Sequence, residues 1–284
     1  MSRQLASHPN PQNIHFYISS GGNAGLACVN ASKALGRAAS VVVPRTTSID
    51  MIAKLRSAGA IEVVQHGASW RDADNYLRSV MMMENPNGVY VPPFDHEDVW
   101  MGNSTIMDEV ATQLANEKPS AVICSVGGGG LFNGIVMGLD RLCWSDVPVL
   151  AIETQGADSL NQSLRVGELV TLPKITSQAT SLGATRVAAQ TLDYAQRPNV
   201  KSAVLDDSEA AMGCLLLAEE ANLMVELGCG VNIALCYDGR LSKILGRSVT
   251  KKDKIVIILC GGRNVSAEML VKWKQDFGYV KRTQ

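Results

Sequence analysis

Hydrophobic positions along the chain fall into short runs that are separated by longer amphipathic stretches. Runs of strand length lie at residues 14–18, 39–43, 61–65, 89–91, 121–126, 147–152 and 255–259. Between them, apolar residues recur at helical spacing over residues 24–35, 48–57, 70–83, 104–116, 131–142, 207–221, 230–245 and 266–277. Strands that alternate with helices are typical of βαβ units, in which helices cover a parallel sheet. We therefore expect an α/β protein with mostly parallel sheets.

A proline pair, Pro92 and Pro93, interrupts this alternation. Such a pair ends regular structure and indicates a domain boundary. We expect two α/β lobes with mostly parallel sheets flanked by helices, a smaller one over residues 1–94 and a larger one over residues 95–284. Residues 167–188 are rich in Ser and Thr without a clear period, which predicts a long loop with short helical pieces.

Charge and cysteine content exclude several classes of protein. Lys and Arg number 26 against 27 Asp and Glu, so there is no electrostatic case for binding nucleic acid or an anionic membrane. No apolar run approaches the ~20 residues of a membrane-spanning helix, and the first residues lack the apolar segment of a secretory signal. The 7 cysteines form no C-x-x-C pair, and the four histidines have no metal-ligand spacing. We expect a cytoplasmic protein with reduced cysteines.

The most specific local feature is the run of four glycines in SVGGGGLFNG at residues 125–134. It lies between a predicted strand and a predicted helix, where bare backbone N–H groups and the helix start suit a phosphate. The alternative is a flexible turn without a ligand, but four glycines carry an entropic cost that a plain turn does not require. The chain has neither a G-x-G-x-x-G register here nor a G-x-x-x-x-G-K-[ST] motif, which argues against a dinucleotide or a nucleoside triphosphate.

Two further loops follow predicted strands. In SSGGNAG, residues 19–25, Ser20 and the following backbone N–H groups suit a carboxylate, and the amide of Asn23 suits a ring hydroxyl; an ordinary capped turn is the alternative. In CGGRN, residues 260–264, Cys260 is expected at the carboxyl edge of a sheet, which is the usual ligand side. A buried structural thiol is the alternative for Cys260.

Six segments together resemble the L-serine/L-threonine dehydratases, pyridoxal-phosphate enzymes of the tryptophan-synthase-β fold type (fold type II). They are SSGGNAG, PFDHEDVWMGNS, SVGGGGLFNG, AIETQGADSL, LPKITSQATSLGA and IVIILCGGRN, and they occur in the order found in that family. The resemblance runs from about Ile14 to the C-terminus. It implies pyridoxal-phosphate-dependent α,β-elimination of water from L-serine, or from L-threonine, giving pyruvate or 2-oxobutanoate and ammonia. It also implies a role in amino-acid degradation and gluconeogenesis, and a homodimer, as is usual in relatives.

The resemblance further implies a role for each matching residue. The cofactor-binding residues are Gly127, Gly128, Gly129, Gly130 and Leu131 at the phosphate, Asn23 at the ring hydroxyl and Cys260 at the pyridine nitrogen. The substrate-binding residues are Ser20, Gly21, Asn23 and Ala24. A monovalent cation such as K⁺ is implied at Glu153, Ala157, Ser159, Leu182 and Ala184. For Glu153, a carboxylate paired to a nearby base is the alternative.

The sequence departs from the family pattern at the catalytic lysine. The family's Schiff-base lysine lies in an S-F-K-x-R-type motif upstream of the serine-rich loop, but residues 1–18 contain no lysine and the first one, Lys33, follows the loop. We therefore expect a truncated chain that lacks its N-terminal segment and is no serine dehydratase by itself. The alternative is a non-catalytic remnant that acts as a binding or interaction protein. Two smaller departures are Arg263, beside the expected cofactor nitrogen, and Leu227, where the family has proline.

Overall fold

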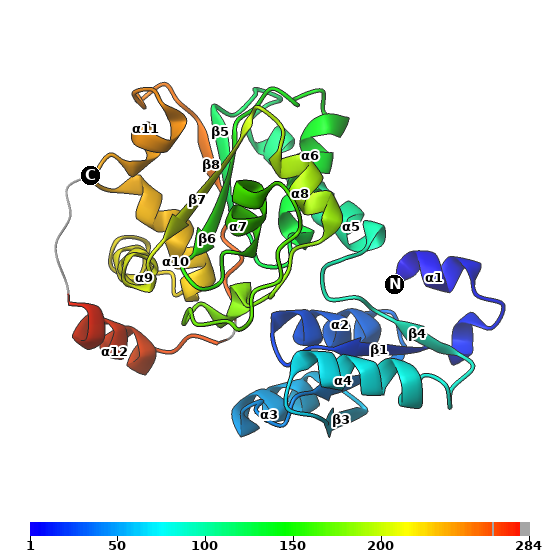
Figure 1. Ribbon diagram of the computed structural model, residues 1–284. Coiled ribbons are helices and arrows are strands. Elements are labelled where there is room, and N and C mark those ends of the chain that lie inside the picture. Colours follow the sequence, from blue (N-terminus) through cyan, green and yellow to red (C-terminus); the bar gives the residue numbers. More distant parts are fainter. Residues whose placement is uncertain (263, 279–284) are drawn as a thin grey trace. The chain divides into compact units, whose positions relative to one another are not determined.

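The computed structural model of the protein describes residues 1–262 and 264–278. The chain forms two compact units that divide between Asp98 and Val99. Each contains one parallel sheet with helices on both faces (Figure 1). The predicted architecture of two parallel-sheet α/β lobes is therefore confirmed. Arg263 lies outside the described residues.

The first unit contains a four-stranded sheet with the order β3-β2-β1-β4. Its strands are β1 (His15–Ser19), β2 (Ala38–Val43), β3 (Glu62–Gln65) and β4 (Gly88–Tyr90). Its helices are α1 (Ser2–Ser7), α2 (Asn23–Ala34), α3 (Ile49–Ala58) and α4 (Trp70–Tyr76), with a 3₁₀ turn at Pro11–Asn13. All strand pairs are parallel, so the carboxyl ends of the strands lie at one edge.

Alternating side chains of β1 fill the two faces of this sheet. Phe16 and Ile18 pack in a cluster with residues of α2 and α3, whereas Tyr17 packs in a cluster with Ala73 of α4. Because successive strand residues point to opposite faces, a continuous apolar run is required when both faces are covered. The apolar run at residues 14–18 is therefore explained by helices that cover both faces of β1.

The second unit contains a parallel sheet with the order β7-β6-β5-β8. Its strands are β5 (Ala121–Ser125), β6 (Val149–Thr154), β7 (Val200–Leu205) and β8 (Ile255–Ile257). One face carries α5 (Glu97–Gln113), α6 (Gly130–Arg141), α7 (Ser159–Val166) and α8 (Ala189–Ala195). The other carries α9 (Asp207–Ala221), α10 (Leu227–Ile233), α11 (Arg240–Leu245) and α12 (Ala267–Phe277). The central strands β5 and β6 are fully buried between these two helical layers, and the edge strands β7 and β8 are partly buried (Figure 1).

Some elements differ from those expected from the sequence. The expected helix over residues 230–245 is interrupted, because Asp238 and Gly239 adopt left-handed backbone with φ of 55° and 67°. Strand β7 was not expected, since Lys201 and Ser202 dilute its apolar pattern. Helix α4 ends at Tyr76 and continues as a π-helical turn over Leu77–Met81. Helix α5 begins at Glu97, before the expected start at residue 104.

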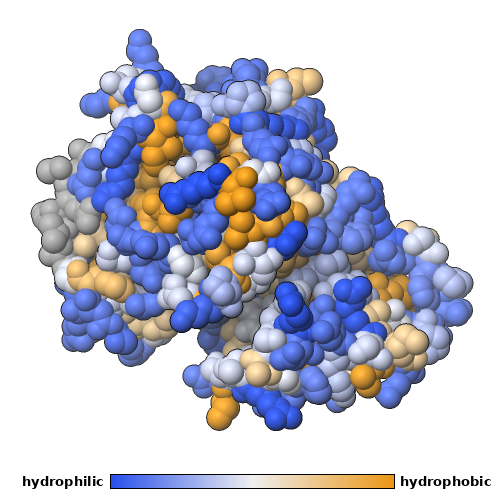
Figure 2. Space-filling view, in the orientation of Figure 1, coloured by the Kyte–Doolittle hydropathy of each residue, from blue (hydrophilic) through white to orange (hydrophobic). Residues whose placement is uncertain are grey.

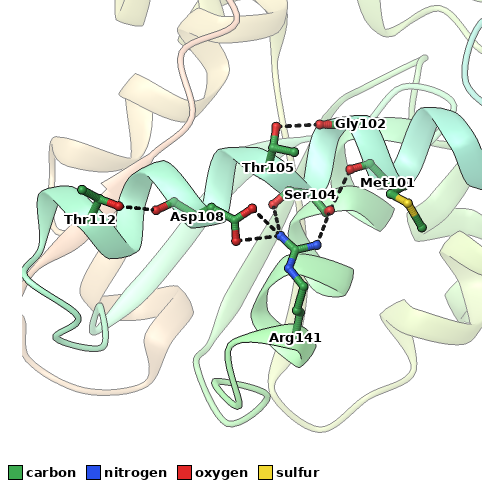
Figure 3. Close-up of polar contacts among 7 residues, drawn as sticks. All are labelled: Met101, Gly102, Ser104, Thr105, Asp108, Thr112 and Arg141. Carbon is green, nitrogen blue, oxygen red and sulfur yellow. Dashed lines mark hydrogen bonds and ion pairs between the residues drawn. The ribbon is translucent and has the colours of Figure 1, made fainter. Parts of the chain in front are cut away.

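Arg141 joins the C-terminal turn of α6 to α5 (Figure 3). Its Nη2 donates to both carboxylate oxygens of Asp108 at 2.8 and 2.7 Å, and its Nη1 donates to Ser104 Oγ at 2.7 Å. The two helices approach closely here, because a Cβ at Gly138 would lie 2.7 Å from the carbonyl oxygen of Ser104. Arg141 thus holds the C-terminal end of α6 against α5, and the N-terminal end of α6 begins in the glycine loop.

Replacing Arg141 with Met should lower the free energy of unfolding by about 1 kcal/mol, since the half-exposed carboxylate contributes little and the buried serine contributes most. Urea denaturation would measure the change. Lys118→Met is the matched control: Lys118 Nζ lies 2.7 Å from Asp146 Oδ1 in a largely exposed pair, and its loss should change stability by less than about 0.5 kcal/mol. Equal effects of the two substitutions would contradict the assignment.

Candidate functional site

The tetraglycine loop connects β5 to α6 in the second unit. Helix α6 begins at Gly130, and its N-cap Gly129 has a left-handed φ of 95°. No side chain caps this end, and its first turn contains no acidic residue. The first N–H groups of a helix have no partner within the helix, and they give this end a partial positive charge. The loop and helix start therefore present donors suited to an anion.

Close packing explains why two positions of this loop are occupied by glycine. A Cβ at Gly129 would lie 1.9 Å from Thr191 Oγ1, and one at Gly127 would lie 3.1 Å from Leu182 Cα. The first distance excludes any side chain, and the positive φ at Gly129 disfavours one independently. The close approach of Thr191 and Leu182 thus requires a loop without side chains at these positions.

Two buried polar side chains adjoin the loop. Asn133 lies in the first turn of α6 and is fully buried, and within the described part of the chain neither of its amide atoms has a hydrogen-bond partner. Thr191 Oγ1, which lies against Gly129, is also buried without a hydrogen-bond partner in the described part of the chain. Buried polar atoms are nearly always bonded in native proteins, so these two mark a place for a further polar group. An amide and a hydroxyl can both donate to phosphate oxygens, so the residues present fit a phosphate.

Sequence reasoning missed both residues. Asn133 stands within the motif SVGGGGLFNG, so its position was a signal that could have been used. Thr191 lies in α8, far along the chain, and no pattern connects it to the loop.

The serine-rich loop of the first unit follows β1 and leads into α2, which begins at Asn23. The N–H of Gly22 donates to Ser20 Oγ at 3.3 Å. A Cβ at Gly25 would lie 2.2 Å from the carbonyl oxygen of Ser20, so the backbone turns tightly at this point. The expected substrate-binding residues Ser20, Gly21, Asn23 and Ala24 all lie on this turn and the first residues of α2. The arrangement suits a carboxylate at the strand end.

Cys260 follows β8, which pairs with β5. Cys260 and the tetraglycine loop therefore both follow the carboxyl ends of neighbouring parallel strands, the side on which α/β sheets bind ligands. Cys260 is exposed, so the alternative of a buried structural thiol does not apply. Leu227, where the family has proline, is buried as the first residue of α10.

Glu153 is a fully buried carboxyl group near the end of β6. Its Oε1 accepts the N–H of Leu160 and its Oε2 accepts the N–H of Asn161, each at 2.8 Å. Burial raises the pKa of this carboxyl to about 8, and the two backbone bonds oppose the rise. Glu153 forms no ion pair with Lys, Arg or His anywhere in residues 1–262 or 264–278. The described residues therefore contain no base paired to Glu153, whose carboxylate is bonded by backbone N–H groups.

The other expected cation ligands lie in segments that meet one another. Ser159 Oγ donates to the carbonyl oxygen of Ala184 at 3.3 Å, and the N–H of Ala184 donates to the carbonyl oxygen of Leu182 at 2.8 Å. Ala157 lies on the turn between Glu153 and Ser159 and bridges back to Thr154. A carboxylate, a hydroxyl and backbone carbonyls are oxygen ligands of the kind that alkali cations take.

Comparison with known proteins identifies the family of the chain. The family described as pyridoxal-phosphate dependent enzyme matches residues 2–261. An L-serine dehydratase of Saccharomyces cerevisiae is 45% identical over 91% of this chain and 80% of its own length. A serine dehydratase-like protein of Homo sapiens is 38% identical over 94% of this chain and 80% of its own. The crystal structure of a fungal L-serine ammonia-lyase from Rhizomucor miehei superposes with a TM-score of 0.86 at 34% identity, covering 96% of this chain and 85% of that one. The chain therefore belongs to the pyridoxal-phosphate-dependent enzyme family, within the group of the L-serine dehydratases.

Proposed function

We propose that this chain binds pyridoxal phosphate and carries the binding residues for α,β-elimination of water from L-serine, or less readily from L-threonine. The products would be pyruvate or 2-oxobutanoate, with ammonia. The observation that carries the proposal is the bare loop at the start of α6, with Gly129 in left-handed backbone and buried Asn133 and Thr191 beside it. When bound, pyridoxal phosphate supplies a sink for the electrons that remain at Cα when its proton leaves.

Each loop has a defined task in this proposal. The N–H groups of Gly127 to Leu131 bind the phosphate, and Cys260 faces the pyridine nitrogen. A thiol there stays neutral and does not protonate the ring, which favours elimination over transamination. In the first unit, the loop after β1 holds the substrate carboxylate, and Asn23 orients the ring hydroxyl.

A carboxylate placed in the glycine loop should strongly weaken cofactor binding. Gly128→Asp puts negative charge among the phosphate donors, and we expect the affinity for pyridoxal phosphate to fall at least about tenfold, which is ~1.4 kcal/mol. Titration followed by the cofactor's absorbance would measure it. Asn116→Asp is the matched control, because it adds the same charge at an exposed left-handed residue that precedes β5, at the opposite end of that strand. Unchanged binding in Gly128→Asp would refute the loop assignment.

The 284 residues contain no S-F-K sequence, and no lysine precedes Lys33. An upstream lysine in the family tethers the cofactor and accepts the Cα proton, and neither glycines nor a neutral thiol replaces an amine in these tasks. We therefore propose that these residues alone bind the cofactor weakly and do not complete the reaction.

The purified 284-residue chain should make no pyruvate from L-serine and should lose pyridoxal phosphate on dialysis. Joining an upstream segment with the S-F-K motif should restore tight binding, the visible absorbance of the tethered cofactor and pyruvate production. A borohydride-reducible lysine adduct together with steady pyruvate production by the unextended chain would show the proposal to be wrong. Cofactor binding without activity in the extended chain would instead favour a non-catalytic binding protein.

We further propose that Glu153, Ala157, Ser159, Leu182 and Ala184 bind a monovalent cation such as K⁺. What supports this is that oxygen atoms of Ser159 and Ala184 meet in the structure, and that a cation would offset the desolvation that raises the pKa of the buried Glu153 carboxyl.

At a K⁺ concentration of ten times Kd, binding to the folded state should raise the free energy of unfolding by about 1.4 kcal/mol relative to choline. Thermal unfolding in KCl and in choline chloride at equal ionic strength would measure the difference. Glu153→Gln should remove it, whereas Glu168→Gln, at an exposed position, should keep it. A K⁺ effect of equal size in both variants would contradict the proposed site.

A homodimer and a cytoplasmic location complete the proposal. Figure 2 shows hydrophobic patches among the mainly hydrophilic residues of the visible face. Large exposed apolar side chains that a second copy could cover include Leu223 and Met224 after α9 and Val271 on α12, which packs on α9. No helix in the described ranges is long and apolar enough to span a bilayer.

A further inference from the structure

Two cysteines meet where the loop after β8 packs on α10. Cys229 lies in the first turn of α10 and is buried, and Cys260 lies on the loop and is exposed. The backbone N–H of Cys260 donates to Cys229 Sγ at 2.9 Å, and the two thiols are hydrogen-bonded to each other. The sulfur atoms of two residues that are distant in sequence are thus adjacent.

Contacts of Glu226 hold the loop in this position. The N–H of Asn264 donates to Glu226 Oε1 at 3.0 Å, and the N–H of Glu226 donates to the carbonyl oxygen of Gly261 at 3.3 Å. Gly262 is in close contact with the same carboxylate, because a Cβ there would lie 1.9 Å from Glu226 Oε1. The approach of the two thiols is therefore built into the packing of the loop.

The surroundings of Cys229 favour its thiolate. The hydrogen bond from the Cys260 thiol lowers the pKa of the Cys229 thiol to about 7, against the effect of burial, and the N–H groups of Cys260 and Gly261 lower it further. Glu226 acts in the opposite direction, as does burial. The same thiol–thiol bond raises the pKa of Cys260, so the proton of the pair resides on Cys260. Cys229 is thus the nucleophile and Cys260 the resolving thiol.

We propose that Cys229 and Cys260 are a peroxide-sensitive pair that closes to an intramolecular disulfide. The Cys229 thiolate attacks one oxygen of hydrogen peroxide and breaks the O–O bond, giving a sulfenic acid at Cys229 and hydroxide. The Cys260 sulfur then attacks Cys229 Sγ, and the hydroxyl of the sulfenic acid leaves. With the thiol protons, two waters are released, two thiols are oxidised and one peroxide is reduced. Closure removes the free thiol of Cys260 from the carboxyl edge of the sheet.

The test uses the full 284-residue chain, reduced and then treated with one equivalent of hydrogen peroxide. Free thiols are alkylated, and peptides are identified by mass spectrometry before and after dithiothreitol. We expect a Cys229–Cys260 cross-link that dithiothreitol reverses. It should form roughly fivefold faster than the exposed thiols Cys143 and Cys236 oxidise, since greater thiolate content outweighs lower intrinsic nucleophilicity.

Two variants separate the steps. Cys260→Ser keeps a hydroxyl donor near Cys229 but removes the resolving sulfur, so Cys229 should accumulate a sulfenic acid that dimedone labels. Cys229→Ser should abolish the cross-link and slow the oxidation of Cys260 to the rate of Cys143. Circular dichroism would establish that both variants fold.

Other outcomes would overturn the pair. Cys214, whose Sγ lies close to α10, is the competing partner on that side. A Cys214–Cys229 cross-link in place of Cys229–Cys260, or oxidation spread evenly over Cys143 and Cys236, would exclude the proposed disulfide. Failure of cofactor binding would leave this result unaffected, because no step of it requires the cofactor.

Discussion

Gly129 turns the chain with a φ of 95° while its Cα lies directly against the side chain of Thr191. Because a Cβ would lie 1.9 Å from Thr191 Oγ1, the turn exists only with glycine, and its position sets where α6 begins. The start of α6 in turn fixes the direction in which the first N–H groups of the helix point. At the other end of α6, Arg141 joins this helix to Ser104 and Asp108 of α5. The start of α6 and the close approach of α8 to the loop thus both depend on the absence of a side chain at Gly129.

Parallel strand pairing supplies the second organising constraint. Every strand in both sheets runs in the same sense as its neighbours, so each loop that carries chemistry emerges at a carboxyl edge. In the second unit this places the tetraglycine loop, Glu153 and Cys260 after β5, near the end of β6 and after β8. The helices that cover the faces leave this edge as the place where polar backbone is open to a ligand.

The features that could be predicted from the sequence are those with a local cause. Four consecutive glycines require an unusual backbone wherever they occur, and a strand that is buried on both faces must be continuously apolar. Strand β7 escaped prediction because it lies at a sheet edge, where Lys201 is tolerated. The roles of Asn133 and Thr191 were not predicted, because tertiary packing decides which polar atoms are buried without a hydrogen-bond partner. The break at Asp238 was missed although Asp followed by Gly is a turn signal, because apolar residues continue at helical spacing on both sides of it.

Strand β8 closes the other edge of the second sheet with only Ile255–Ile257, a short and strongly apolar segment. Within the described residues no strand pairs with the outer side of β8, and an open edge of this kind is a template on which another polypeptide can add a strand. Lys251, Lys252 and Lys254 immediately precede it. Lys254 pairs with Glu117, and the charges of Lys251 and Lys252 would repel those of a second copy in an edge-to-edge association. Basic residues before β8 therefore disfavour the addition of a second chain to this edge of the sheet.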